Sequence, residues 1–285
     1  MLKSVKTTAK ILSAGLLAGA AVSAPSVASA AAYELSEEQK RAIVALLTAP
    51  KAAPGIGIGV PTGFGAGQGQ VYASIGGTTT KDASNEDDYD GSASVGIGFG
   101  DANEFVALEL QANIISLTDN ADDSDFGEEG SISAKLSRNV GRTSAISFGA
   151  ENISTWGDSL DDTDASAYIA FTTVKALSDN PSNPLTLSFT IGAGTERFQD
   201  LDNGVRDSGP GIFGALALAV HRQVGLIADY NGNYTSVGLS LVPLRSCPLT
   251  VTLSAVNVNE VSAADGGTST GDTEFGGSIG YSWNF

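Results

Sequence analysis

From about residue 70 to the C-terminus, apolar residues alternate with small or polar residues. In the clearest run, 185–194, leucine, phenylalanine, isoleucine and alanine alternate with threonine, serine and glycine. A period of two is typical of a strand with one apolar face, whereas an amphipathic helix has a period of 3.6. Twelve such runs occur, at 70–78, 92–99, 105–114, 131–138, 144–151, 166–176, 185–194, 211–221, 223–230, 235–241, 249–255 and 274–285. The chain therefore predicts an all-β fold of about twelve strands.

The connections between these runs alternate between long and short. The long ones are 79–91, 117–130, 152–165, 195–209 and 257–273. The tight Asn231-Gly232 hairpin is an exception, because the alternation places it on the same side as the long connections. A transmembrane barrel has an even number of strands, short periplasmic turns and longer external loops. We therefore expect residues 70–285 to form a closed antiparallel transmembrane β-barrel.

The composition excludes several classes of function. The 285 residues carry 32 acidic and 15 basic side chains, a net charge of −17, which argues against a nucleic-acid partner. One cysteine and one histidine exclude a disulfide framework and a multi-histidine zinc site, so we expect no metal site and no cofactor. Of the 32 acidic residues, 22 fall in the five long connections. The charge is thus expected on one rim, although solvated loops of no further significance explain it equally well.

The N-terminus predicts export. Residues 1–30 have the features of a signal peptide: three lysines, an apolar stretch over 11–24 and a cleavage motif that ends at Ala30. Removing those lysines changes the net charge of −17 to −20. Residues 31–69 then predict a short helix over 33–49 and a segment rich in glycine and proline. This region lies either in the periplasm or inside the barrel as a plug.

The C-terminal run carries a family resemblance. Ile279, Tyr281, Trp283 and Phe285 share one face of the last predicted strand, and Phe285 ends the chain. This pattern resembles the insertion signal of bacterial outer-membrane β-barrel proteins, without indicating a subfamily. The resemblance implies location in a bacterial outer membrane and contact with its lipid and lipopolysaccharide. It also implies recognition by the outer-membrane assembly machinery.

Aromatic residues near the strand ends are expected to form girdles at the two membrane interfaces. Phe99 and Phe105 join the C-terminal aromatic residues at the periplasmic rim. The candidates for the outer rim are Phe213, Tyr230, Tyr234 and Phe275.

The inward face is predicted to be small and polar. Strand parity points Glu109, Gln111, Asn113, Lys135 and Glu151 into the lumen, and Asp229 near its outer mouth. We take these six as candidate pore-lining residues. Glu109 and Lys135 flank the 117–130 connection and can pair across their strands. Such a pair either braces the wall or forms a charged constriction that selects solutes.

The function indicated is a porin-like channel for passive diffusion of small solutes, with a preference for cations, and not an enzyme. The alternatives are a barrel with a structural role, a lipid hydrolase and a secreted soluble β adhesin. A hydrolase needs a histidine base beside its nucleophile, and His221, the sole candidate, is expected at the short-turn end. The class also allows a homo-oligomer.

Overall fold

The computed structural model describes residues 36, 51–81, 87–114, 117, 127–157, 164–178, 180, 185–202, 205–206, 208–262 and 271–285. The chain divides into two compact units, residues 1–44 and 45–285, and the description below concerns the second. The predicted signal peptide and, apart from Ser36, the predicted helix over 33–49 lie outside the described residues.

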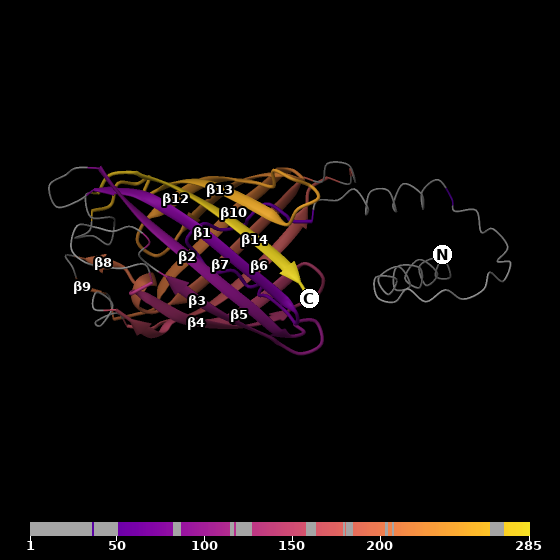
Figure 1. Ribbon diagram of the computed structural model, residues 1–285, viewed down its shortest axis with the longest axis horizontal. Coiled ribbons are helices and arrows are strands. Elements are labelled where there is room, and N and C mark those ends of the chain that lie inside the picture. The colour runs from indigo at the N-terminus through magenta and orange to yellow at the C-terminus, as the bar shows by residue number, and fades with distance from the viewer. Residues whose placement is uncertain are drawn as a thin grey trace. The chain divides into compact units, whose positions relative to one another are not determined.

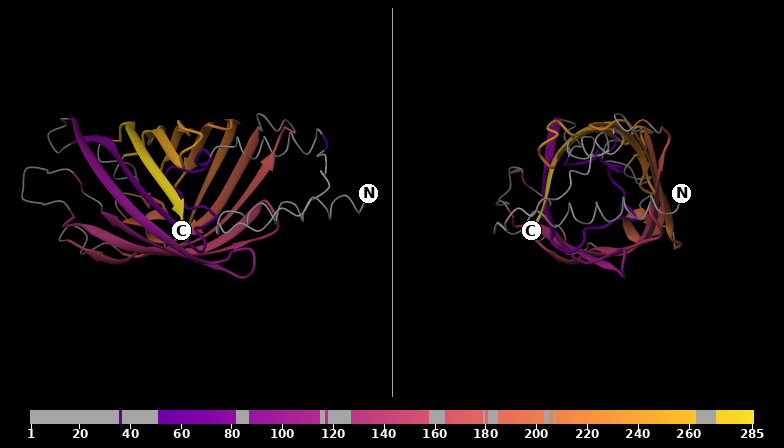
Figure 2. Two further views of the ribbon diagram at one scale, coloured as in Figure 1. Left: turned by 45° about the vertical axis from the view of Figure 1, so that its right-hand side comes forward. Right: turned by 90° about the vertical axis from the view of Figure 1, so that its right-hand side faces the viewer.

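Twelve antiparallel strands form a closed barrel, which confirms the predicted fold class (Figures 1 and 2). The barrel strands are β1 (Gln70–Lys81), β2 (Asp87–Gly100), β3 (Ala107–Ile114), β4 (Gly130–Asn139), β5 (Ser144–Trp156), β6 (Ser166–Ala176), β7 (Thr186–Gly194), β10 (Gly211–His221), β11 (Val224–Tyr230), β12 (Thr235–Leu241), β13 (Leu249–Val256) and β14 (Glu274–Asn284). Each strand pairs with the next, and β1 pairs with β14, with Gln70 opposite Asn284. The 3-10 helix η2 (Glu196–Phe198) and the hairpin β8 (Leu201–Asp202)–β9 (Val205–Arg206) occupy the connection between β7 and β10.

The barrel has two unlike ends. The first residue of β1 and the last of β14 lie at the end that carries the short connections, such as Arg222–Gln223 between β10 and β11. We call this the short-turn end and the opposite one the long-loop end. One predicted long connection, 79–91, is mostly strand, because the β1–β2 ladder continues to Lys81 opposite Asp87. Backbone ladder bonds do not require apolar side chains, so the hairpin extends beyond the alternating run.

Apolar side chains lie on the outer surface of the barrel, and small polar side chains face its interior. On β7, Phe189 and Ile191 are 41% and 48% exposed, whereas Ser188 and Thr190 are 5% and 1% exposed. The alternation therefore places apolar residues on the outer surface and small polar residues inside, as a barrel surrounded by hydrocarbon requires. Within the described residues, no helix has the length and apolarity needed to cross a membrane.

The predicted direction of Phe213 is wrong. Its side chain is 1% exposed and points inward, next to Ala215 and Ala217, while Ile212 and Leu216 point outward. Both faces of β10 are apolar, so its pattern alone leaves the orientation open. The pairing of β10 with β7 and β11 decides the orientation.

Candidate functional site

Residues 51–69, here called the lumenal segment, run inside the barrel without regular secondary structure (Figure 2). The segment begins at the short-turn end, where the Lys51 N–H donates to the Arg245 carbonyl over 3.0 Å. Near its middle, the N–H groups of Ile58 and Gly59 donate to Asp229, which is one residue from the long-loop end of β11. It then returns to the short-turn end, where Gln68 N–H donates to Gly100 over 2.7 Å. The segment is therefore a hairpin within the lumen, and residues 58–61 form its apex.

Inward side chains of the barrel satisfy the backbone of this segment. Asp229 accepts the two apex N–H groups over 2.6 and 2.9 Å, and Glu109 accepts Ala66 N–H over 2.6 Å. Hydroxyl groups contribute three further bonds: Ser240 accepts Gly55 N–H, Thr172 accepts Gly63 N–H, and Ser147 donates to the Thr62 carbonyl. A segment without helix or sheet pairing must find such partners when it is buried. The polar inner face of the barrel supplies them.

The segment approaches the wall so closely that glycine is required on both sides of the contact. A Cβ atom at Gly63 would overlap the Ala145 carbonyl oxygen, and one at Gly98 of β2 would overlap the backbone of Ala66 and Gly67. Some glycines of this chain therefore accommodate the segment.

The lumenal segment fills the barrel unevenly. Inward residues of β6, β7, β10 and β12 are almost fully covered, including Thr172, Thr190, Ala215 and Ser240. Inward Ser92 of β2, by contrast, is exposed. A first cavity of about 400 Å³ lies between the apex and the walls of β3, β4 and β5. A second, of about 280 Å³, is lined mostly by glycine, serine and threonine of β1, β2, β13 and β14.

A third cavity of about 330 Å³ shares Gln111, Asn113 and Asn152 with the first and Ser92 with the second. The three cavities therefore adjoin one another along the side of the lumen that the segment leaves free.

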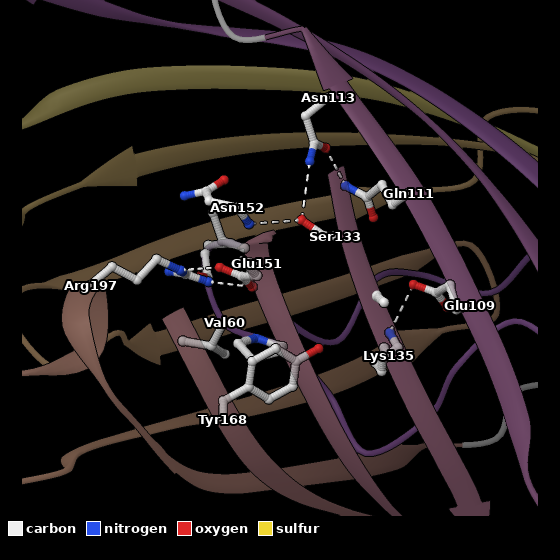
Figure 3. Close-up of a pocket in the computed structure, with 14 residues that line it drawn as sticks. Val60, Glu109, Gln111, Asn113, Ser133, Lys135, Glu151, Asn152, Tyr168 and Arg197 are labelled. Atoms are coloured by element: carbon white, nitrogen blue, oxygen red, sulfur yellow. Dashed lines mark hydrogen bonds and ion pairs between the residues drawn. The ribbon is translucent and has the colours of Figure 1, made fainter. Parts of the chain in front are cut away.

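Two ion pairs line the first cavity (Figure 3). Lys135 Nζ lies 3.1 Å from Glu109 Oε1, and the two residues are register partners on β3 and β4, which confirms the predicted pairing. Glu151 forms a bidentate pair with Arg197, in which Nη2 donates to Oε1 over 2.9 Å and Nε donates to Oε2. We call these four side chains the charge cluster. Its formal charges sum to zero.

Arg197 was not among the residues expected from the sequence, because it lies in a predicted external connection. Helix η2 instead brings Arg197 to the first cavity, where its Nη1 donates to the Gly59 carbonyl over 3.1 Å. The adjacent Phe198 is fully buried, with its ring centroid 4.6 Å from that of Phe213 and 5.9 Å from that of Tyr168. The sequence did contain one indication of this inward position: Arg197 and Phe198 are adjacent in a connection that is otherwise rich in acidic residues.

Amide side chains continue the polar wall from Glu109 along β3 toward the long-loop end. The Tyr72 hydroxyl, which has one hydrogen to donate, lies 2.9 Å from a Glu109 oxygen and 2.7 Å from the Gln111 amide oxygen, and Gln111 donates to Asn113. Asn113 in turn donates to Ser131 and Ser133 over 3.3 and 3.4 Å. The residues at 109, 111 and 113 therefore form a continuous polar track along β3.

A β-bulge places two consecutive polar side chains at the first cavity. The β4–β5 register shifts between Ile132 and Ala134, and Asn152 on the bulged strand has φ of 55°. Glu151 and Asn152 both line the cavity as a result. A bulge changes the direction of the side chains on its strand in this way. A left-handed backbone is uncommon at residues other than glycine.

Five of the six predicted pore-lining residues line the first cavity: Glu109, Gln111, Asn113, Lys135 and Glu151. Asp229 lies elsewhere, 4% exposed, and its carboxylate binds the lumenal segment. Near it, between β11 and β12, burial raises the pKa of the Tyr234 phenol above its ordinary value, so this group remains neutral.

The four C-terminal residues expected to form the assembly signal face outward. Ile279, Tyr281, Trp283 and Phe285 are all exposed, and the rings of Tyr281 and Trp283 lie 5.8 Å apart. The Phe285 N–H donates to the Gly69 carbonyl over 3.0 Å, which ties the last residue to the start of β1. Recognition of this strand by an assembly machinery remains a prediction.

The chain matches no protein-family model and no curated protein. Among solved structures, it is similar to an outer membrane channel from Pseudomonas putida F1, with 9% sequence identity and a TM-score of 0.44. That alignment covers 80% of this chain and 100% of the other.

Proposed function

We propose that this chain forms a channel in a bacterial outer membrane through which small solutes diffuse passively. The observation that carries the proposal is a closed barrel with an apolar outer surface whose polar lumen is only partly filled by its own N-terminal segment. A barrel of twelve strands encloses space that small inward side chains cannot fill. The three adjoining polar cavities beside the lumenal segment support the proposal.

Two features support the outer membrane as the location. The sequence begins with a predicted export signal and ends with an outward-facing aromatic strand. A closed barrel also satisfies every wall strand by pairing, which a bilayer requires because hydrocarbon offers no hydrogen-bond partners. Partition of the protein into the aqueous phase without detergent would overturn this location.

We expect a moderate preference for cations. The acidic residues concentrate in the connections of one end, and a negatively charged mouth raises the local concentration of cations. Salt screens this effect, so the preference should decline as the salt concentration rises. Planar-bilayer recordings in a KCl gradient test both parts of the proposal. A reversal potential that indicates anion preference would contradict the cation selectivity, and absence of current would contradict the channel.

The proposal includes no catalytic step. His221 ends β10 at the short-turn end, where its Nδ1 accepts the Gln223 N–H over 3.3 Å. We expect His221→Ala and the unmodified protein to give the same background value in a phospholipid hydrolysis assay. Hydrolysis that disappears in the variant would favour the lipid-hydrolase alternative.

A further inference from the structure

We infer that the first cavity is a binding site for a neutral polyhydroxylated solute of about the size of a monosaccharide. The inference rests on the proposed channel function and names the class of solute that the lumen recognises. The cavity volume, about 400 Å³, lies in the range of sites that enclose small molecules. Its lining is mainly polar and includes both ion pairs.

The charge cluster presents no unpaired charge to a solute. Glu109 accepts hydrogen bonds from Lys135, Tyr72 and the Ala66 N–H, so both carboxylate oxygens are occupied. Glu151 uses both oxygens for Arg197. An ion that leaves water for this cavity gains no free counter-charge there, and its desolvation is left uncompensated. A neutral solute does not bear that cost.

The amide and hydroxyl side chains next to the charge cluster suit hydroxyl groups as ligands. Gln111, Asn113 and Ser133 line the cavity, and carboxamides both donate and accept hydrogen bonds. A sugar or polyol carries adjacent hydroxyl groups with the same dual capacity. Such a solute can therefore exchange its hydrogen bonds to water for bonds to the wall without breaking either ion pair.

Asn152 is the residue that most directly indicates a ligand. Its carboxamide lines the cavity beside Glu151 and makes no hydrogen bond within the described residues, whereas its backbone N–H lies 3.4 Å from Ser133 Oγ (Figure 3). It sits at the bulge with a positive φ of 55°. The bulge thus directs the Asn152 carboxamide into the cavity beside Glu151.

An apolar surface completes the site. Tyr168 and Val60 line the cavity and are 9% and 8% exposed, so each presents only part of its side chain. An aromatic ring offers a flat apolar face to the C–H groups of a pyranose, while its hydroxyl remains available for hydrogen bonding. The cavity thus combines hydrogen-bonding groups on the walls of β3, β4 and β5 with an apolar patch.

The test uses the full mature protein in planar bilayers at constant ionic strength. D-Glucose, D-glucosamine and D-gluconate are added separately, because they have similar size and differ in charge. We expect glucose to reduce the KCl current in a saturable way and the two charged compounds to do so at least about fivefold more weakly. Equal or stronger block by either charged compound overturns the inference.

Two variants in the first cavity and one control in the second test the location of the site. Asn152→Gly keeps the positive φ accessible and removes the carboxamide. It should weaken glucose block, measured relative to the variant's own KCl current, about fivefold, the change expected for one neutral hydrogen bond. Ser254→Ala, in the second cavity, is the matched control and should retain wild-type block. Arg197→Gln leaves Glu151 unpaired and should reverse the order, with glucosamine blocking more strongly than glucose.

The outcomes separate the inference from the proposed function. A KCl current that glucose does not reduce overturns the neutral-solute site and leaves the channel intact. Wild-type block in Asn152→Gly overturns the placement of the site at the bulge. No KCl current in any preparation overturns the channel and, with it, the inference.

Discussion

The Oδ2 atom of Asp229 accepts a hydrogen bond of 2.6 Å from the backbone N–H of Ile58, 171 positions earlier in the chain. The same oxygen accepts the Gly59 N–H over 2.9 Å. A carboxylate that binds two successive backbone amides holds the apex of the lumenal segment against β11. We expect this contact to limit the part of the lumen that remains free, and the first prediction tests it.

Asp229→Ala should raise the single-channel conductance. The two apex amides lose their acceptor, and the free energy of unfolding should fall by about 1–3 kcal/mol. Ser236→Ala is the matched control, since Ser236 is the buried register partner of Asp229 on β12 and makes no side-chain bond to the lumenal segment within the described residues. Conductance in the Asp229 variant equal to that of the control would show that this carboxylate does not hold the apex.

Gly63→Ala and Gly59→Ala form a second matched pair within the lumenal segment. A methyl group at position 63 meets the Ala145 carbonyl, whereas one at position 59 has no atom within 4 Å. The first substitution should destabilise the seated segment by about 1–3 kcal/mol, the usual cost of overpacking. We expect a lower thermal midpoint of heat-modifiable gel mobility for Gly63→Ala only. Equal midpoints would contradict the close packing of this segment.

Deletion of residues 31–62 should increase conductance more than any single substitution. The deletion removes the apex and opens the space between Asp229 and the charge cluster. Polyethylene glycols of graded size, added to the bilayer chamber, would measure the gain in pore diameter. An unchanged size cut-off would mean that the segment does not limit the pore.

The opposite charges of Glu109 and Lys135 should together set the ion selectivity of the channel. Glu109→Gln leaves Lys135 unpaired and should shift the reversal potential toward anions, while Lys135→Gln should shift it toward cations. The double variant should return close to the wild-type value, because both charges are removed. Additive shifts with the same sign would be inconsistent with a paired constriction.

Deletion of Phe285 should reduce the amount of folded protein in the outer membrane. Its side chain is 78% exposed and ends the outward aromatic face of β14. Asn284→Ser changes the neighbouring residue and is the control. Folded protein would be quantified by heat-modifiable mobility in isolated membranes. Wild-type levels after the deletion would argue against a terminal insertion signal.

Local alternation determined most of the wall. A period of two makes one face apolar, and this pattern located all twelve barrel strands, although several extend beyond the predicted ends. Strand parity also indicated the inward direction of Glu109 and Lys135, and neighbouring strands then made them partners. These properties depend on a few adjacent residues or on consecutive strands, so they can be read directly from the sequence.

The contents of the lumen were decided by the tertiary structure. Residues 51–69 form no regular secondary structure, and their backbone binds side chains far away in the sequence, such as Asp229 and Glu109. Arg197 is held at the first cavity by its bonds to Glu151 and Gly59 and by the burial of Phe198 against Phe213 and Tyr168. Glycine and serine on the wall are compatible with an open lumen or a filled one. The sequence by itself therefore determined a barrel with a polar interior, whereas long-range packing decided which part of that interior stays open.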